Sequence, residues 1–301
     1  MSRKKQKKEL KICETKIQAI NNLKKYGFCL IKNAISKNDT IELKNKLKKI
    51  GCEEDSKNAS YREGGYIKWG EFKNNNNYDN EPNQRIWMLV NKDEIFLKML
   101  KNKKIRKIIN DVLGSDYILS SHGANIIGPG NIPMDLHVDQ WWMPLPIIPN
   151  TSYTPVSSIT RKNLNCNPLL KSIQPPVVFN VLWMLDDFIE DNGSTTLIPY
   201  SHLCINNVDN YNPISVVAPK GTALIIDGRT LHGTGCNITN KNRYAILTTF
   251  CGPQFRPQEN YPFGLKQKII NNLDEDLLNL LGFKIWNGYG RIGDPNKIFI
   301  N

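Results

Sequence analysis

The sequence predicts a mainly β fold, a sandwich or barrel of short strands with helices on either side. Two observations support this prediction. From about residue 117 onward, short apolar runs alternate with turns rich in Gly and Pro, which is typical of packed antiparallel strands rather than of alternating strand–helix units. Before and after this region, apolar residues recur at helical spacing among lysines, which indicates flanking helices.

The first 115 residues are predicted to be mostly helical. A short strand is expected at 28–31 and a long polar loop at 52–83, because the latter is rich in Gly and Asn. Gly27 and Gly114 are expected to end helices. The segments with helical periodicity are residues 3–26, 40–50 and 94–113.

The β region is predicted over residues 116–255. Residues 144–176 contain seven prolines and are expected to form an insertion loop within it. Residues 256–301 are expected to form a helical tail with one closing helix over 265–281, so that 1–301 is a single domain. The expected strands are 117–127, the segment around His137, 177–185, 195–199, 214–218, 222–227 and 244–251.

Length and composition favour a globular protein without a membrane span. At 301 residues the chain can bury a sizeable core, and no apolar run approaches the roughly 18 to 20 residues of a membrane helix. The basic N-terminus lacks the apolar segment of a secretory signal. Seven scattered cysteines without a Cys-x-x-Cys pair favour reduced thiols and a cytoplasmic setting over disulfides or structural zinc.

The net charge of +12 has two interpretations. It can reflect attraction to nucleic acid, an acidic membrane surface or a phosphorylated substrate. It can also reflect a compositional bias, because lysine and asparagine are abundant together, as in the run 74–77, and basic residues are spread widely. We favour the second interpretation, so nucleic acid is not the expected partner. Nothing in the sequence specifies an oligomeric state.

Three residues form a candidate metal site. His137 and Asp139 are two positions apart, so in an extended segment their side chains project from the same side. A second histidine, His232, lies far downstream in DGRTLHGTG, on a strand that a jelly roll would bring alongside. Two histidines and one carboxylate on a β framework are the ligand set that holds non-heme Fe(II) and leaves positions open for cosubstrate and oxygen.

Arg243 is a candidate anion-binding residue. It lies eleven residues after His232, at the start of an apolar strand, so its burial requires an anionic partner. A guanidinium offers two parallel hydrogen bonds to a carboxylate, and the hydroxyl of Thr234 is placed to join it. The alternative is that Arg243 pairs with Asp227 or another nearby acid of the chain.

Several motifs together resemble the phytanoyl-CoA dioxygenase family of Fe(II)- and 2-oxoglutarate-dependent oxygenases. The resemblance covers nearly the whole chain. Tyr200 departs from it, because the family usually has glycine before its Ser-His pair. The matching stretches are KYGFCLIKNAIS (25–36), LHVD (136–139), LWMLDDFIEDNG (182–193), LIPYSH (197–202), HGT (232–234) and Arg243.

The resemblance implies a double-stranded β-helix, or cupin-like jelly roll, with iron at its open mouth. His137, Asp139 and His232 would hold Fe(II), and 2-oxoglutarate would bind the iron while its far carboxylate meets Arg243 and Thr234. With O2 the expected reaction is hydroxylation of a small organic molecule, with release of succinate and CO2. The intact carboxylate ligand argues against halogenation.

Other positions have two interpretations each. Asn180 and Asn125 either touch the cosubstrate or satisfy the backbone. Gln140, Trp141 and Trp142 either line the mouth and contact the substrate or belong to the core. His202, by the resemblance, supports the fold and is not expected to bind metal.

Two rival functions remain open. One is a cupin-like enzyme that uses another divalent metal in a different reaction, in which case Arg243 has no dicarboxylate to bind. The other is a non-catalytic protein whose basic N-terminus contacts nucleic acid.

Overall fold

The structure, a computed structural model, describes residues 12–66, 81–144, 155–159, 174–203, 212–294 and 296–299. Most of the expected insertion over 144–176, and the start of the first expected helix, lie outside these ranges. Within them, no helix is both long enough and apolar enough to cross a bilayer.

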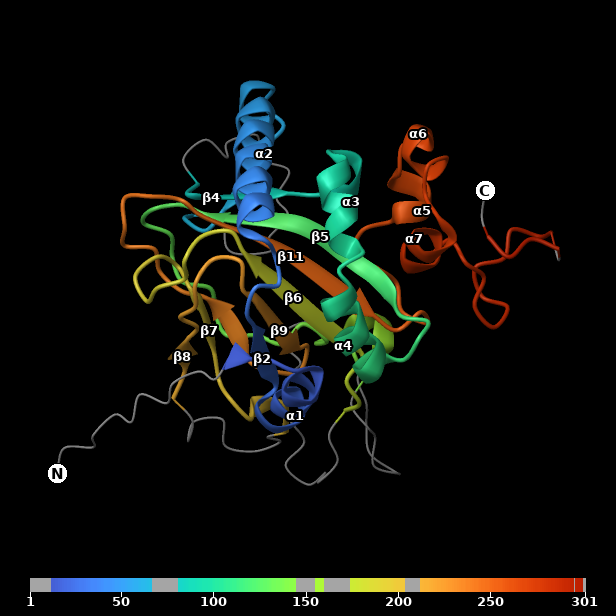
Figure 1. Cartoon of the computed structure of the whole chain (residues 1–301), viewed down its shortest axis with the longest axis horizontal. Coiled ribbons are helices and arrows are strands. Elements are labelled where there is room, and N and C mark those ends of the chain that lie inside the picture. Colours follow the sequence, from blue (N-terminus) through green and yellow to red (C-terminus); the bar gives the residue numbers. More distant parts are fainter. Residues whose placement is uncertain are drawn as a thin grey trace.

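The described strands form two sheets (Figure 1). The large sheet has the order β1-β2-β9-β6-β11-β5-β4-β3, in which only the β1–β2 pairing is parallel. Its strands are β1 (Ile12–Cys13), β2 (Phe28–Ile31), β3 (Tyr61–Glu63), β4 (Asn83–Ile86), β5 (Ile118–Ile127), β6 (Val178–Met184), β9 (Ala223–Asp227) and β11 (Arg243–Cys251). The small sheet, in the order β10-β7-β8, consists of β7 (Thr195–Leu197), β8 (Ile214–Ser215) and β10 (His232–Thr234).

The two sheets face each other across an apolar layer. Leu182 and Met184 of β6 and Leu224 of β9 pack there against Leu197 of β7 and Val216, which follows β8. The described strands therefore form an open two-sheet sandwich rather than a closed barrel, and the predicted mainly β fold is confirmed.

Helices cover the other face of the large sheet (Figure 1). Residues of β6 alternate between the two faces, so that Phe179, Val181 and Trp183 join the core beneath the helices. The helices are α1 (Lys16–Tyr26), α2 (Lys37–Ser56), α3 (Glu94–Leu100), α4 (Lys103–Leu113), α5 (Tyr261–Gly264), α6 (Gln267–Ile270) and α7 (Glu275–Leu280), with 3-10 turns at Leu89–Asn91, Val156–Ser158 and Ser201–Leu203.

Two helix boundaries differ from the sequence prediction because of capping residues. The first helix begins at Lys16, where the Thr15 side chain accepts from the Gln18 backbone and the Gln18 side chain accepts in return, a capping box. The single closing helix expected over 265–281 is two short helices, because the Asp274 side chain caps a new helix at Leu277 N–H. The end of the first helix at Gly27, in the left-handed conformation with φ 83°, is as predicted.

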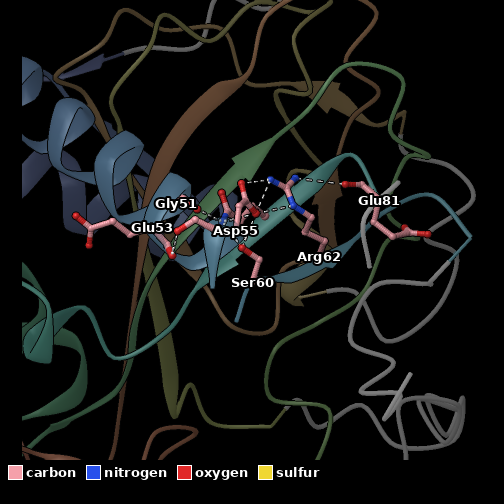
Figure 2. Close-up of polar contacts among 8 residues, drawn as sticks. Gly51, Glu53, Asp55, Ser60, Arg62 and Glu81 are labelled. Atoms are coloured by element: carbon pink, nitrogen blue, oxygen red, sulfur yellow. Dashed lines mark hydrogen bonds and ion pairs between the residues drawn. The ribbon is translucent and has the colours of Figure 1, made fainter. Parts of the chain in front are cut away.

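The loop expected over 52–83 contains regular structure. Residues 52–56 continue α2, and β3 pairs with β4 in a hairpin. A polar network joins the end of α2 to this hairpin: Arg62 donates to both oxygens of Asp55, and the hydroxyl of Ser60 donates to the same carboxylate (Figure 2). The network holds the hairpin whose residues Tyr61 and Glu63 line the cavity described below.

Candidate metal centre and its cavity

Two histidines and one carboxylate that are distant in sequence lie together. The ligand atoms of His137, Asp139 and His232 are all within 4.8 Å of one another. Nε2 of His137 is 3.3 Å from Oδ1 of Asp139, and Nε2 of His232 is 3.3 Å from Oδ2. Two imidazoles and one carboxylate in this arrangement fit a first-row divalent metal ion and leave part of its coordination sphere open.

Backbone hydrogen bonds bring the ligands together. His137 does not lie on a regular strand, contrary to expectation; it forms an isolated bridge with His232 on β10, in which each N–H donates to the other's carbonyl at 3.0 Å. The N–H of Asp139 donates to the carbonyl of Gly228 at 2.7 Å. Gly233 permits the close approach, because a Cβ there would lie 2.7 Å from the carbonyl oxygen of Met134.

Both imidazoles are oriented by backbone carbonyls. Nδ1 of His137 lies 3.1 Å from the carbonyl oxygen of Asp135, and Nδ1 of His232 lies 2.9 Å from that of Thr230. A carbonyl can only accept, so in each ring Nδ1 carries the proton and Nε2 offers its lone pair to the site. In the absence of a metal ion, removal from water raises the pKa of Asp139, but the charge and hydrogen bonds of His232 and His137 in their protonated forms outweigh it and hold that pKa well below its usual range.

Asn180 contacts the metal-site carboxylate. Its Nδ2 donates to Oδ2 of Asp139, and its Oδ1 accepts from the hydroxyl of Thr249 at 2.7 Å. Thr249 was not identified from the sequence. It is one of two adjacent threonines in an apolar strand, and only the register between β6 and β11 places it opposite Asn180.

Arg243 is a buried cation that has no acidic partner in contact among the described residues. It is 1% exposed, its Nη2 donates to the carbonyl of Gly193, and its guanidinium carbon lies 4.3 Å from the ring centre of Phe188. Among the residues that the structure describes, Nε and Nη1 have no hydrogen-bond partner. Burial lowers the pKa of Arg243 to about 9.

The expected alternative, a pair between Arg243 and Asp227, is wrong. Asp227 accepts from the guanidinium of Arg229, at 2.9 Å and 2.6 Å, and from its backbone N–H. Asp186 raises the pKa of Arg243 through its charge, but its carboxylate is hydrogen-bonded to Lys44 and to the N–H of Tyr244.

The metal site opens into a cavity of about 2030 Å³. Leu182 of β6 and Leu247 of β11 form part of its floor beyond Asn180, and Thr234 and Asn125 lie on its wall. Within the described ranges, Oδ1 of Asn125 is buried without a hydrogen-bond partner. Arg243 lies on the same face of β11 as Leu247 and Thr249, which line the cavity. The candidate metal ligands, the apolar floor and the two Arg243 donors that are unpaired among the described residues suit a molecule with acceptor groups at both ends and methylene groups between them, so the residues fit 2-oxoglutarate.

The residues after the metal motif divide between cavity and core. Trp141 and Trp142 both line the cavity, and the ring of Trp142 also packs on Phe255, with 4.9 Å between centroids. Gln140 is 1% exposed, and its amide donates to the carbonyl of Pro175 and accepts from the N–H of Val177. Its polar atoms are thus used within the protein.

His202 and Tyr200 belong to the fold. His202 is 4% exposed, and its Nε2 lies 3.0 Å from the carbonyl oxygen of Lys24 in α1. Tyr200 has a φ of 70°, the left-handed conformation that glycine adopts most easily, which is the residue the related family usually has here. Its ring packs edge-on against Tyr26.

Two cavity-wall groups were missed from the sequence. The carboxylate of Glu63 accepts from Nε of Arg85 at 2.7 Å and from the hydroxyl of Tyr61 at 3.1 Å. Glu259, after the last strand, accepts from the N–H groups of Met88 and His122 and from the hydroxyl of Tyr261. No local pattern marks these acids, because their partners come from other elements.

The sequence is similar to those of fungal dioxygenases. Dioxygenase af480 of Aspergillus fumigatus is 28% identical over 208 residues, which cover 67% of this chain and 59% of that protein. Dioxygenase ALT11 of Alternaria alternata is 28% identical over 183 residues, 59% of each protein. The chain thus spans about three fifths of the length of these relatives.

Solved structures share the fold at low identity. The epimerase SnoN from nogalamycin biosynthesis, in complex with Fe3+, alpha ketoglutarate and nogalamycin RO, has a TM-score of 0.57 at 14% identity, over 81% of this chain and 86% of that one. HygX from Streptomyces hygroscopicus, with nickel, 2-oxoglutarate and hygromycin B bound, has a TM-score of 0.56 at 12% identity, over 80% and 88%.

The profile described as phytanoyl-CoA dioxygenase (PhyH) matches residues 23–245, about three quarters of the chain. This confirms the resemblance noted from the sequence motifs: the chain is a member of the phytanoyl-CoA dioxygenase family.

Proposed function

We propose that this protein is an Fe(II)- and 2-oxoglutarate-dependent oxygenase that hydroxylates a small organic molecule and releases succinate and CO2. The observation that carries the proposal is the convergence of His137, Asp139 and His232 at the cavity. Arg243 supports it, because its Nε and Nη1 have no hydrogen-bond partner among the described residues and it lies on the same face of β11 as the cavity-lining Leu247 and Thr249. Iron, bound with 2-oxoglutarate and O2, supplies the oxidising chemistry. Every other part of the reaction depends on how the chain holds and orients the reactants.

The cosubstrate is held at both ends. Arg243 Nε and Nη1, with the hydroxyl of Thr234, would hold its far carboxylate, which would replace the solvation that the buried guanidinium lacks. Leu182 and Leu247 accommodate the methylene groups. Asn125, beside Arg85 in the β4–β5 pairing, offers its amide to the same molecule from the neighbouring strands.

The substrate is an organic molecule with a large apolar part. The cavity volume exceeds the roughly 300–1,000 Å³ of an ordinary ligand pocket, so it accepts a sizeable substrate beside the cosubstrate. Trp141 and Trp142 contact this substrate, and the aromatic wall around them excludes water from the reacting centre. The Tyr, Trp and Phe residues of the lining are Tyr61, Tyr66, Trp87, Trp141, Trp142, Phe255 and Phe263.

Arg243 favours this proposal over the alternative of a cupin-like enzyme with another reaction. That enzyme would need the metal ligands but no dicarboxylate. The two Arg243 donors that are unpaired among the described residues would then have no ligand to bind. The buried free thiols of Cys13, Cys29 and Cys251 are consistent with a reducing, cytoplasmic setting, which we propose as its location.

Metal content and succinate formation test the proposal. The wild-type protein is expected to bind about one Fe(II) per chain under anaerobic conditions and to form succinate from 2-oxoglutarate when O2 is admitted. His137→Ala and His232→Ala are expected to lose both, because two ligands cannot replace three. His202→Gln is the matched control for a histidine outside the site and is expected to keep its iron. Wild-type iron content in both ligand variants would refute the assignment.

A further inference from the structure

Asn180 projects from the middle of the large sheet into the metal site. Its strand, β6, lies between β9 and β11 and is paired along both edges. Phe179 and Val181, on either side of it in sequence, are packed in the core beneath the helices, and Asn180 itself is 1% exposed. A side chain anchored in this way has little freedom to move. The group that its amide contacts is therefore held in one position.

Both polar ends of the Asn180 amide are used. Thr249 lies directly opposite on β11, and its hydroxyl donates to Oδ1, while Nδ2 donates to Oδ2 of Asp139. The reversed amide would place Oδ1 against the carboxylate, with two acceptors facing each other. Carboxylate, amide and hydroxyl therefore support a single arrangement.

Asp139 needs such support because it lies outside the strands. Its backbone is attached through one hydrogen bond to the carbonyl of Gly228, and its carboxylate lies between two imidazoles. The hydrogen bond from Asn180 engages one carboxylate oxygen, Oδ2. The direction of the carboxylate is thus set from the sheet and not from its own loop.

We propose that Asn180 is a positioning residue for the metal: with Thr249 it orients the carboxylate of Asp139, and it does not bind 2-oxoglutarate. The inference rests on the proposed function, because it takes Asp139 to be a metal ligand. It differs from both interpretations of Asn180 that the sequence left open, contact with the cosubstrate and contact with the backbone, because both partners of the amide are side chains. Hydrogen-bond partners that orient metal ligands contribute to metal affinity, and their loss lowers that affinity by about 10- to 100-fold.

The two possible roles of Asn180 predict losses of affinity for different ligands, the metal ion or 2-oxoglutarate. If it orients Asp139, Asn180→Ala weakens metal binding and leaves cosubstrate affinity nearly unchanged once metal is saturating. If it binds 2-oxoglutarate, the same variant weakens cosubstrate binding only. Asn125→Ala is the matched control: it removes a second cavity-lining asparagine, from β5, and is expected to weaken cosubstrate binding at unchanged metal affinity.

The experiment measures Mn(II) binding to the full chain by calorimetry, followed by 2-oxoglutarate binding at saturating Mn(II). Asn180→Ala is expected to raise the Kd for Mn(II) about 10- to 100-fold. Thr249→Val keeps the side-chain shape but removes the hydroxyl, and the loss of one net hydrogen bond corresponds to about fivefold. Thr249→Ser keeps a hydroxyl and is expected to stay within about twofold of wild type, a change of under half that hydrogen bond.

Each outcome decides a separate point. An Asn180→Ala protein with wild-type Mn(II) affinity overturns the positioning role, and so does a loss confined to 2-oxoglutarate. If Asn180→Ala does not fold, equal Mn(II) affinities for Thr249→Val and Thr249→Ser overturn it instead. His137→Ala reports on the proposed function: if its Mn(II) affinity is unchanged, the metal site itself is wrong, whereas a loss there without a loss in Asn180→Ala overturns the role of Asn180 alone.

Discussion

Replacing Arg243 with methionine is expected to stabilise the protein and to abolish cosubstrate binding. The side chain is 1% exposed, and two of its three guanidinium nitrogens find no acceptor within the described part of the chain. Burial lowers the pKa of Arg243 well below its usual value, to about 9, so the group stays charged at neutral pH but its charge opposes folding. A methionine keeps an unbranched apolar side chain over the Phe188 ring and removes the charge.

The size of both effects follows from these contacts. The fall of the Arg243 pKa to about 9 corresponds to roughly 5 kcal/mol against the charged form in the folded state. Methionine leaves the carbonyl of Gly193 without its donor, which costs about 1–3 kcal/mol, so a net gain of a few kcal/mol is expected. Two charge-assisted hydrogen bonds to a carboxylate contribute about 1.5–3 kcal/mol each, so 2-oxoglutarate affinity should fall at least about 100-fold.

Thermal unfolding with and without 2-oxoglutarate, in the presence of Mn(II), measures both effects. At 100 times its Kd a ligand stabilises by about 2.7 kcal/mol, which for 301 residues raises the Tm by roughly 4 °C. Wild type is expected to show this rise, and Arg243→Met is expected to show none at the same concentration while its ligand-free Tm exceeds that of wild type. Arg229→Met is the matched control, because Arg229 is paired with Asp227 and its loss is expected to destabilise the protein.

Two results would refute the reasoning. A 2-oxoglutarate Kd for Arg243→Met within threefold of wild type would mean that the dicarboxylate is bound elsewhere. A ligand-free Tm that falls as far as in Arg229→Met would mean that Arg243 has an acidic partner and is not held for a ligand.

Three further outcomes are expected. The Kd for 2-oxoglutarate, measured by calorimetry, should be constant near neutral pH and rise as the pH passes about 9, because Arg243 then loses its proton in the free protein; a Kd independent of pH up to 10 contradicts this. Gly233→Ala should weaken Mn(II) binding, because its Cβ would displace the carbonyl of Met134 and with it the His137 segment; unchanged Mn(II) affinity would show that this segment can shift freely. Arg62→Ala should lower the free energy of unfolding by about 0.5–1 kcal/mol at pH 7. Burial raises the pKa of Asp55, but the hydrogen bonds from Arg62 and Ser60 outweigh it and lower that pKa in the folded protein. The difference from wild type in urea unfolding should therefore begin to shrink as the pH falls below about 4, and a difference at pH 2 as large as that at pH 7 would exclude the ion pair as its source.

Sequence patterns located those parts of the fold in which one periodicity runs without interruption. The run 177–185 is continuously apolar apart from Asn180, and it forms β6 within one residue at either end. Gly27 and Gly114 end helices as predicted, because the first adopts the left-handed conformation and the second also has a positive φ. The candidate metal ligands were selected for a different reason: few residue types bind iron, and the chain has only four histidines.

The contacts around the ligands could not be predicted, because each depends on a register between distant segments. Asn180 is opposite Thr249 only because β6 and β11 pair in one register, and a shift by one residue would turn its amide into the helical core. Gln140 follows the metal motif directly, yet its amide bonds to the segment at Pro175, which approaches from the other end of the insertion. In both cases the sequence pointed to a polar residue near the site, but its hydrogen-bond partner could not be predicted from the sequence.

The site combines two groups of residues that can be changed separately. The metal ligands lie outside the large sheet, and their positions depend on attachments at Gly228, Gly233 and Asn180. Arg243 instead belongs to β11, a long strand in the middle of that sheet. Its charge is buried there with no acid in contact among the described residues, and burial lowers its pKa. Changes in the first group should therefore alter metal affinity with little effect on global stability, except where backbone must move. Changes at Arg243 should alter stability and cosubstrate affinity in opposite directions, because the same uncompensated charge opposes folding and binds the dicarboxylate.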